Sequence, residues 1–226
     1  MVCLQGIEVL RVEADKIKLR TLILSLVAIL LIEAATRIVV LKGLCPPMVT
    51  LGVARLIEII LIVLIVICWG EGLSSIGLAR PGYFQGLKKG LIWSAGFGLL
   101  TLLAFVVAHV AGIDALPLIQ IRLPMKGVDV LTFFIVGGIV GPVAEEVFFR
   151  GMLYGFFRRW GVVLALLVST LIFVLFHPIN HGFPVPQVVG GIVFAVAYEL
   201  EGSLMVPITI HVLGNLAIFS LSFLGG

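Results

Sequence analysis

Residues 141–151 read GPVAEEVFFRG and lie near the end of a long apolar run. Glu145, Glu146 and Arg150 therefore place three ionisable groups in sequence that is otherwise typical of a membrane helix. An ionisable side chain at bilayer depth costs at least about 2.5–3.5 kcal/mol on insertion scales. Ionisable side chains that a membrane helix contains despite this cost are functional by default. The alternative is that they only hold helices together. The stretch predicts a membrane helix that carries a polar site.

Helical geometry separates the roles of the two carboxylates. On an α-helix adjacent residues point about 100° apart, so Glu145 and Glu146 cannot share one role. Glu146 and Arg150 are four residues apart on one face and can form an ion pair. This pairing leaves Glu145 without a local partner, which suits general-base work in a lipid-shielded site.

The composition extends the membrane prediction to nearly the whole chain of 226 residues. It is 61% hydrophobic and only 12% charged, whereas soluble domains average about 45–50% apolar and 25% charged residues. We therefore expect one integral membrane domain over residues 1–226. The formal net charge of +3 concerns topology and contact with anionic lipid, and it does not indicate nucleic-acid binding. The three cysteines have no CxxC spacing and indicate neither a disulfide framework nor a metal site.

The apolar segments predict an all-α, polytopic helix bundle of about seven spans joined by short connections. They cover about residues 21–40, 49–69, 91–110, 130–159, 162–176, 187–200 and 204–223. The last four spans would surround a polar intramembrane cavity. Residues 70–90 are expected to form a basic connection, and residues 1–20 an amphipathic surface segment rather than a signal peptide. The distribution of Lys and Arg favours a cytoplasmic N-terminus in the plasma membrane.

The first two spans each contain an acid and a base. Glu33 and Arg37 are four residues apart, and Arg55 and Glu58 are three apart. Both pairs lie toward one side of the membrane, so they can also pair between the spans. We interpret them as structural, because each acid has a base within one helical turn.

Two further polar sets follow Glu145 along the chain. His177 ends the fifth span, one turn after Phe173, and His211 stands one turn before Asn215 in the seventh. Counted from the turn between spans four and five, Glu145 and His177 lie at comparable depth, about 20–26 Å at 1.5 Å per residue. His211 comes out shallower by the same count unless its helix is tilted or has a re-entrant start.

These residue types suit hydrolysis. Glu145 with His177 could hold and deprotonate a water, while His211 and the Asn215 amide could donate to the oxyanion formed at a carbonyl. Two histidines and a glutamate could instead bind zinc. There is no HExxH motif, and an asparagine is an unusual zinc ligand, so we favour water activated without a metal or other cofactor.

The three motifs, in order on successive helices, resemble the signature of the CAAX protease and bacteriocin-processing family. This family is also called ABI, for abortive infection, and it includes the type II CAAX prenyl endopeptidases. The motif-bearing core spans about residues 130–219 and contains Glu145-Glu146-x-x-x-Arg150, Phe173-x-x-x-His177 and His211-x-x-x-Asn215.

The resemblance implies a hydrolase, an intramembrane glutamic endopeptidase. It implies that Glu145 and His177 activate water, that His211 and Asn215 form the oxyanion hole, and that the supporting residues are Glu146, Arg150 and Phe173. The implied substrates are membrane-associated peptides or proteins, either prenylated CAAX-type or bacteriocin-type. Eukaryotic members that process prenylated proteins tend to have one helix more than the seven counted here, which leaves the substrate class open.

A non-catalytic protein is the alternative from another class. An immunity scaffold or a proton-coupled carrier could use the same Glu and His residues for packing or as a relay. Against a carrier, the chain has no inverted repeat and no pair of broken helices. The sequence does not indicate an oligomeric state.

Overall fold

The computed structural model describes residues 16–79, 82–124, 127–177 and 184–224. Most of the predicted N-terminal surface segment lies outside this part of the chain. The longer elements are α1 (Leu19–Leu41), α2 (Pro47–Trp69), α3 (Tyr83–Val110), α4 (Gly127–Ile135), α5 (Gly141–Glu146), α7 (Val162–Leu175), α8 (Val185–Glu201) and α9 (Met205–Leu224). Short helical elements join them: η1 (Leu73–Ile76), η3 (Leu116–Leu118), η4 (Val136–Val140), η5 (Val147–Tyr154), α6 (Gly155–Phe157) and η6 (Arg158–Trp160).

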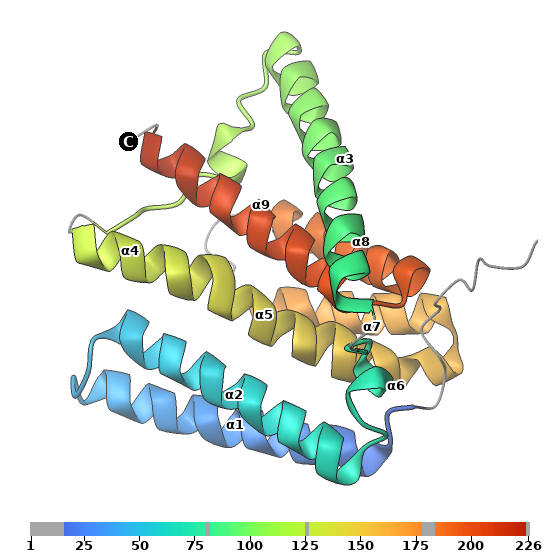
Figure 1. The fold of residues 1–226 in the computed structure, drawn as a ribbon. Coiled ribbons are helices and arrows are strands. Elements are labelled where there is room, and N and C mark those ends of the chain that lie inside the picture. The colour runs from blue at the N-terminus through green and yellow to red at the C-terminus, as the bar shows by residue number, and fades with distance from the viewer. Residues whose placement is uncertain (1–15, 80–81, 125–126, 178–183, 225–226) are drawn as a thin grey trace, which may run out of the picture.

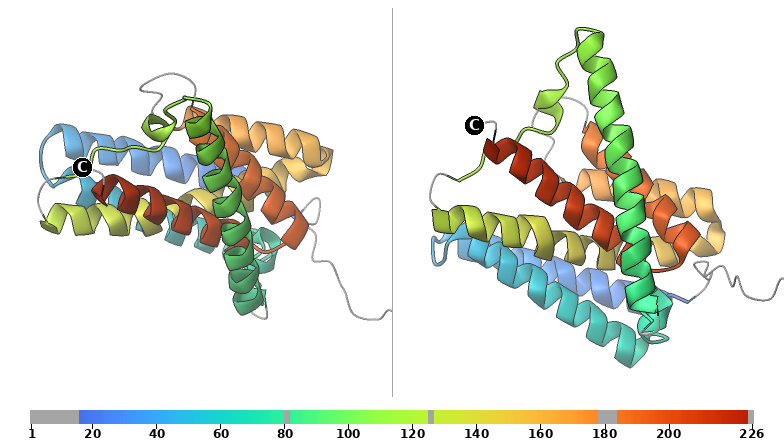
Figure 2. Two further views of the ribbon diagram at one scale, coloured as in Figure 1. Left: turned by 90° about the horizontal axis from the view of Figure 1, so that it is seen from above. Right: turned by 45° about the horizontal axis from the view of Figure 1, so that its top comes forward.

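A continuous rod from α4 to η6 runs through the middle of the bundle (Figure 1). The antiparallel hairpin of α1 and α2 packs along one side of it, with α2 against η4 and α5. On the other side α9 crosses the rod at η4 and α5, while α7 packs against η5 and pairs with α8. Helix α3 packs against α9 and leans away from the rest, as the right-hand view in Figure 2 shows. The rod therefore contacts both halves of the bundle.

The prediction of an all-α polytopic membrane bundle is confirmed. Within the described residues five helices are long and apolar enough to cross a membrane: α1, α2, α3, the rod over Gly127–Trp160, and α9. Helix α7 is apolar but has 14 residues, which is about 21 Å against a hydrocarbon core of about 30 Å. Helix α8 has 17 residues. The seven predicted spans thus correspond to five full-length helices and two shorter ones.

Helix α3 begins earlier than predicted. It starts at Tyr83, so Lys88 and Lys89 belong to the helix, and the prediction that they lie in a connection is wrong. The physical reason is a local partner: the Lys89 ammonium lies 2.6 Å from a carboxylate oxygen of Glu201 at the end of α8. A paired lysine at a helix terminus does not interrupt a membrane helix.

The central rod widens at two places. In η4 and η5 the backbone follows π-helical geometry, and the ordinary α-helical turns of α5 lie between them. At η4 the N–H of Gly141 donates to the carbonyl of Val136, five residues back. Pro142 explains this turn, because its ring would clash with the carbonyl four residues before it in an α-helix. Such wide turns occur frequently at functional sites.

The charged residues of the first two spans do pair between helices. One nitrogen of Arg55 lies 2.8 Å from Glu33 of α1 and 2.6 Å from Glu58 of α2. The predicted cross-pairing is therefore confirmed.

The contact between α3 and α9 depends on small residues and supplies a test of the fold. A Cβ at Gly90 would lie 2.6 Å from the Thr209 Cβ, whereas a Cβ at Gly96 on the same helix would meet nothing within 4 Å. We expect Gly90→Ala to lower the free energy of unfolding by about 1–3 kcal/mol through overpacking. The control Gly96→Ala should raise it by up to about 1 kcal/mol through helix propensity. Unfolding in detergent measures both, and equal effects of the two variants would contradict this packing.

Candidate active site

A buried ion pair forms the base of the site. Glu146 from α5 and Arg150 from η5 are both fully buried, and two of the Arg150 nitrogens lie 3.1 Å from the two Glu146 oxygens. The third nitrogen donates to the Gly191 carbonyl of α8 at 3.1 Å. The predicted pairing between these two residues is confirmed, and it ties the central rod to α8.

Two aromatic rings enclose the Arg150 guanidinium. Its central carbon lies 4.7 Å from the ring centre of Phe173 on α7 and 5.3 Å from that of Phe194 on α8. A desolvated cation over an aromatic face gains up to about 2 kcal/mol. These contacts make the pocket apolar on its sides and give Phe173 a supporting position.

His211 binds the same buried carboxylate. Its Nδ1 lies 2.7 Å from Glu146 Oε1, and its ring stacks on Phe194 with centres 4.7 Å apart. A carboxylate paired with Arg150 only accepts hydrogen bonds, so His211 Nδ1 is the donor. The other ring nitrogen, Nε2, is thereby turned toward Glu145.

His177 is oriented by a backbone carbonyl. It follows α7 directly, and its Nδ1 lies 2.8 Å from the carbonyl oxygen of Phe173, one turn earlier. Since a carbonyl oxygen accepts, this nitrogen also carries a proton, and Nε2 of the neutral ring is an acceptor. The Phe-x-x-x-His spacing thus sets the direction of the histidine.

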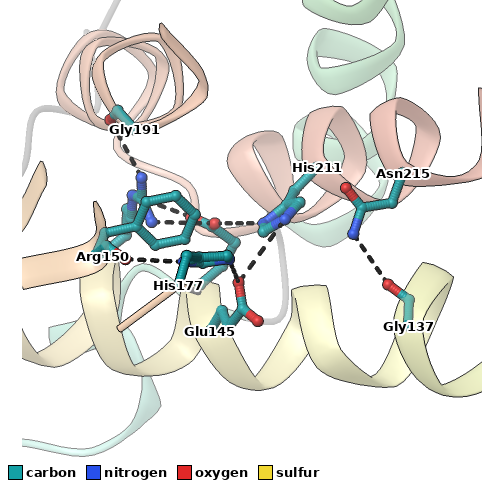
Figure 3. Close-up of polar contacts among 9 residues, drawn as sticks. Gly137, Glu145, Arg150, His177, Gly191, His211 and Asn215 are labelled. Carbon is teal, nitrogen blue, oxygen red and sulfur yellow. Dashed lines mark hydrogen bonds and ion pairs between the residues drawn. The ribbon is translucent and has the colours of Figure 1, made fainter. Parts of the chain in front are cut away.

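The two histidines converge on one oxygen of Glu145. Their Nε2 atoms lie 3.7 Å and 3.8 Å from Glu145 Oε2, as Figure 3 shows. These separations are longer than a direct hydrogen bond. Within the described part of the chain this buried oxygen has no hydrogen-bond partner. The arginine of the motif forms its ion pair with Glu146 and not with Glu145.

Asn215 lies beside this group and is turned away from it. It stands one turn after His211 on α9, and its Nδ2 donates to the carbonyl of Gly137 at 2.9 Å (Figure 3). The amide still has a second N–H. The structure therefore brings Glu145, His177 and His211 together and places Asn215 at the edge, so its predicted oxyanion role stays a prediction.

Helix α9 starts inside the bundle, which is the alternative that brings His211 to the depth of Glu145. Leu204 and Val206, at its N-terminal end, are fully buried. A helix that starts below the surface and crosses the rod obliquely reaches Glu145 within two turns (Figure 1).

Helix α2 contributes charges that the sequence indicated only as structural. Arg55 and Glu58 both lie within electrostatic range of Glu145. Glu58 is 3% exposed, and one of its oxygens has no hydrogen-bond partner among the described residues. The sequence did contain a signal for this contribution, because ionisable residues within a membrane span are functional by default. Phe194, Gly191 and Gly137 were missed because they carry no such signal.

Other candidate groups lie apart from this site. His109 is at the far end of α3, beside a hollow that also contains Asp114. His181 falls outside the described residues. Among the residues that are described, no group of three His, Cys, Asp or Glu side chains is arranged to hold a metal ion.

Comparison with known proteins adds a family to this geometry. Residues 127–217 match the family model of the type II CAAX prenyl endopeptidases, Rce1-like. Over 98 residues the chain is 35% identical to the membrane-embedded CAAX protease MroQ of Staphylococcus aureus (strain USA300). This match covers 40% of the chain and 38% of that protein. No solved structure matches. All seven motif residues lie within residues 127–217, so the resemblance found in the sequence is confirmed.

The buried pair generates a prediction about stability. Glu146→Gln removes a charge that Arg150 and His211 both contact, so we expect a loss of about 3–5 kcal/mol in the free energy of unfolding. The matched control is Glu145→Gln, which removes the adjacent charge but no hydrogen bond and should change stability far less. Chemical unfolding in detergent measures both variants. Equal stability of Glu146→Gln and the unsubstituted protein would show that the pair does not support the fold.

Proposed function

Since residues 127–217 match the Rce1-like family of type II CAAX prenyl endopeptidases, we propose that this membrane protein is a hydrolase that cleaves peptide bonds of membrane-associated substrates. The attacking group is a water activated by Glu145 and His177. One observation carries the proposal: Glu145 Oε2 faces two imidazole Nε2 atoms at 3.7 and 3.8 Å. A base so placed needs only a water and a carbonyl to act.

The reaction follows from these positions. A water between Glu145 Oε2 and His177 Nε2 donates a hydrogen bond to each, and its oxygen attacks the substrate carbonyl. The proton passes to Glu145 as the new C–O bond forms, and the carbonyl electrons move to its oxygen. When the C–N bond breaks, Glu145 returns that proton to the leaving amine. The second hydrogen of the water stays on the new carboxyl group, so the products are a carboxylic acid and an amine, and the enzyme is unchanged.

The partners of the two histidines support different roles. His177 Nδ1 bonds a neutral carbonyl, which favours a neutral ring whose Nε2 accepts from water. His211 Nδ1 bonds the Glu146 carboxylate at 2.7 Å, and in the proposed role this ring enters the reaction as an imidazolium beside that negative charge. In that form Nε2–H donates to the oxyanion, and the second N–H of Asn215 is its proposed companion.

The substrate class is proposed from the family and from the relative named a CAAX protease. A prenylated CAAX-type protein or a bacteriocin-type peptide would reach the pocket from the bilayer. Several basic groups lie at one end of the bundle, where Lys18 pairs with Glu71, Lys89 with Glu201 and Arg158 with Glu199. This supports a cytoplasmic orientation of that end, and with it of the N-terminus, in the plasma membrane.

Substitution of the base tests the proposal. Purified protein in detergent should cleave a membrane-tethered peptide, and Glu145→Gln should abolish cleavage because an amide cannot accept the proton. Asn215→Ala should leave residual activity, reduced by about 10²–10³-fold, the usual loss for one oxyanion donor. The control Glu71→Gln removes an exposed carboxylate at 50% side-chain exposure and should not affect cleavage. Full activity of Glu145→Gln would show that Glu145 is not the base, whereas no cleavage by the unsubstituted protein would favour a non-catalytic scaffold or carrier.

Metal dependence supplies a separate prediction. We propose hydrolysis without a metal, so strong chelators should leave the rate of cleavage unchanged. A zinc enzyme would lose activity on chelation and regain it with added zinc, because the metal generates the hydroxide. Measured zinc content that tracks activity across preparations would overturn the metal-free proposal and leave the family assignment standing.

A further inference from the structure

The wide turn at η4 leaves one backbone carbonyl without a helical donor. There the N–H of Gly141 donates to Val136, five residues back. In the same pattern Gly137 would accept from residue 142, which is a proline and has no N–H. An unpaired carbonyl away from water costs about 1–3 kcal/mol, so this oxygen needs a donor from outside its own helix.

Asn215 supplies that donor from α9. Its Nδ2 lies 2.9 Å from the Gly137 oxygen, and Figure 3 shows the amide directed at this carbonyl. The helices approach closely at this point: a Cβ at Gly138 would lie 2.7 Å from a methyl carbon of Leu216, and one at Gly137 would lie 3.2 Å from the Phe219 ring. The two glycines thus bring α9 within hydrogen-bonding distance of the rod.

We propose that Pro142 is a positioning residue for Asn215. By removing the backbone donor, Pro142 makes the Gly137 carbonyl a dedicated acceptor for one N–H of the amide. Because the amide group is planar, this bond also sets the direction of the second N–H. The inference rests on the proposed function, in which that second N–H donates to the oxyanion. It extends the site to a residue with no reactive side chain.

Pro142→Ala tests the positioning role in catalysis. The alanine N–H can bond the Gly137 carbonyl, or the turn can relax toward an α-helix, and in both cases the amide loses its dedicated acceptor. We expect kcat to fall at least about tenfold with KM unchanged, because misplacement of a transition-state donor affects the chemical step. In an Asn215→Ala background the same change should alter kcat less than about twofold, since contacts in one network are not additive. The matched control is Pro47→Ala at the exposed first turn of α2, where no helical bond is lost.

The carbonyl itself gives a readout that does not depend on activity. Consecutive glycines occur at 137–138, 190–191 and 225–226. With glycine labelled by ¹³C at the carbonyl and by ¹⁵N, a carbonyl-to-amide correlation arises only at these pairs. Asn215→Ala should move the Gly137 carbonyl resonance and leave that of Gly190 in place. Adding Pro142→Ala should move the Gly137 resonance back, because a backbone donor replaces the amide.

These measurements separate the possible failures. An unchanged Gly137 resonance in Asn215→Ala, or losses in kcat that simply multiply in the double variant, would overturn the positioning role. If Pro142→Ala does not fold, the resonance in Asn215→Ala still decides whether the amide is anchored. If the unsubstituted protein cleaves no peptide, the proposed function fails and the catalytic half of this inference fails with it, while the resonance still tests the anchor.

Discussion

The carboxylate of Glu146 is shared between a guanidinium and an imidazole, and the rest of the site depends on it. Glu146 contacts Arg150 at 3.1 Å and His211 at 2.7 Å, with no exposure to solvent for the pair. Removal of one partner would leave an uncompensated charge in apolar surroundings, which is far more costly than the pair itself is favourable. Through Arg150 the contact also reaches α7 and α8. Four separate helical segments are therefore held by one buried charge.

This arrangement leaves the neighbouring residue free for chemistry. Because Glu146 forms the close contacts with Arg150 and His211 Nδ1, Glu145 is left to face the outer nitrogens of His177 and His211. The α-helical turn of α5 directs the two carboxylates apart, and the wide turns on either side adjust how the rod meets α7 and α9. A base without an ion-pair partner of its own, beside two imidazole nitrogens, suits hydrolysis of a peptide bond.

Some of these features follow from residue spacing and others do not. The ion pair of Glu146 with Arg150 and the direction of His177 are local, set by four-residue separations on one helix. The pairing of Arg55 with Glu33 followed from equal depth in adjacent spans. The position of His211 required the buried start of α9, and the partner of Asn215 required the wide turn at Pro142, neither of which apolar periodicity reveals. The approach of Arg55 and Glu58 to Glu145 depended on how α2 packs, which spacing along one helix cannot show.

The central claim is that water attacks the peptide bond directly, without a covalent acyl-enzyme. The alternative is attack by a side-chain hydroxyl, such as the buried hydroxyl of Thr170 on α7, which would form an acyl-enzyme. The most direct measurement is single-turnover cleavage of a membrane-tethered peptide in ¹⁸O-labelled water with added hydroxylamine, followed by mass analysis of the new C-terminus. The account predicts only a carboxylic acid with one ¹⁸O atom from the labelled water. A hydroxamate product that increases with hydroxylamine concentration would reveal an acyl-enzyme and contradict the role assigned to Glu145.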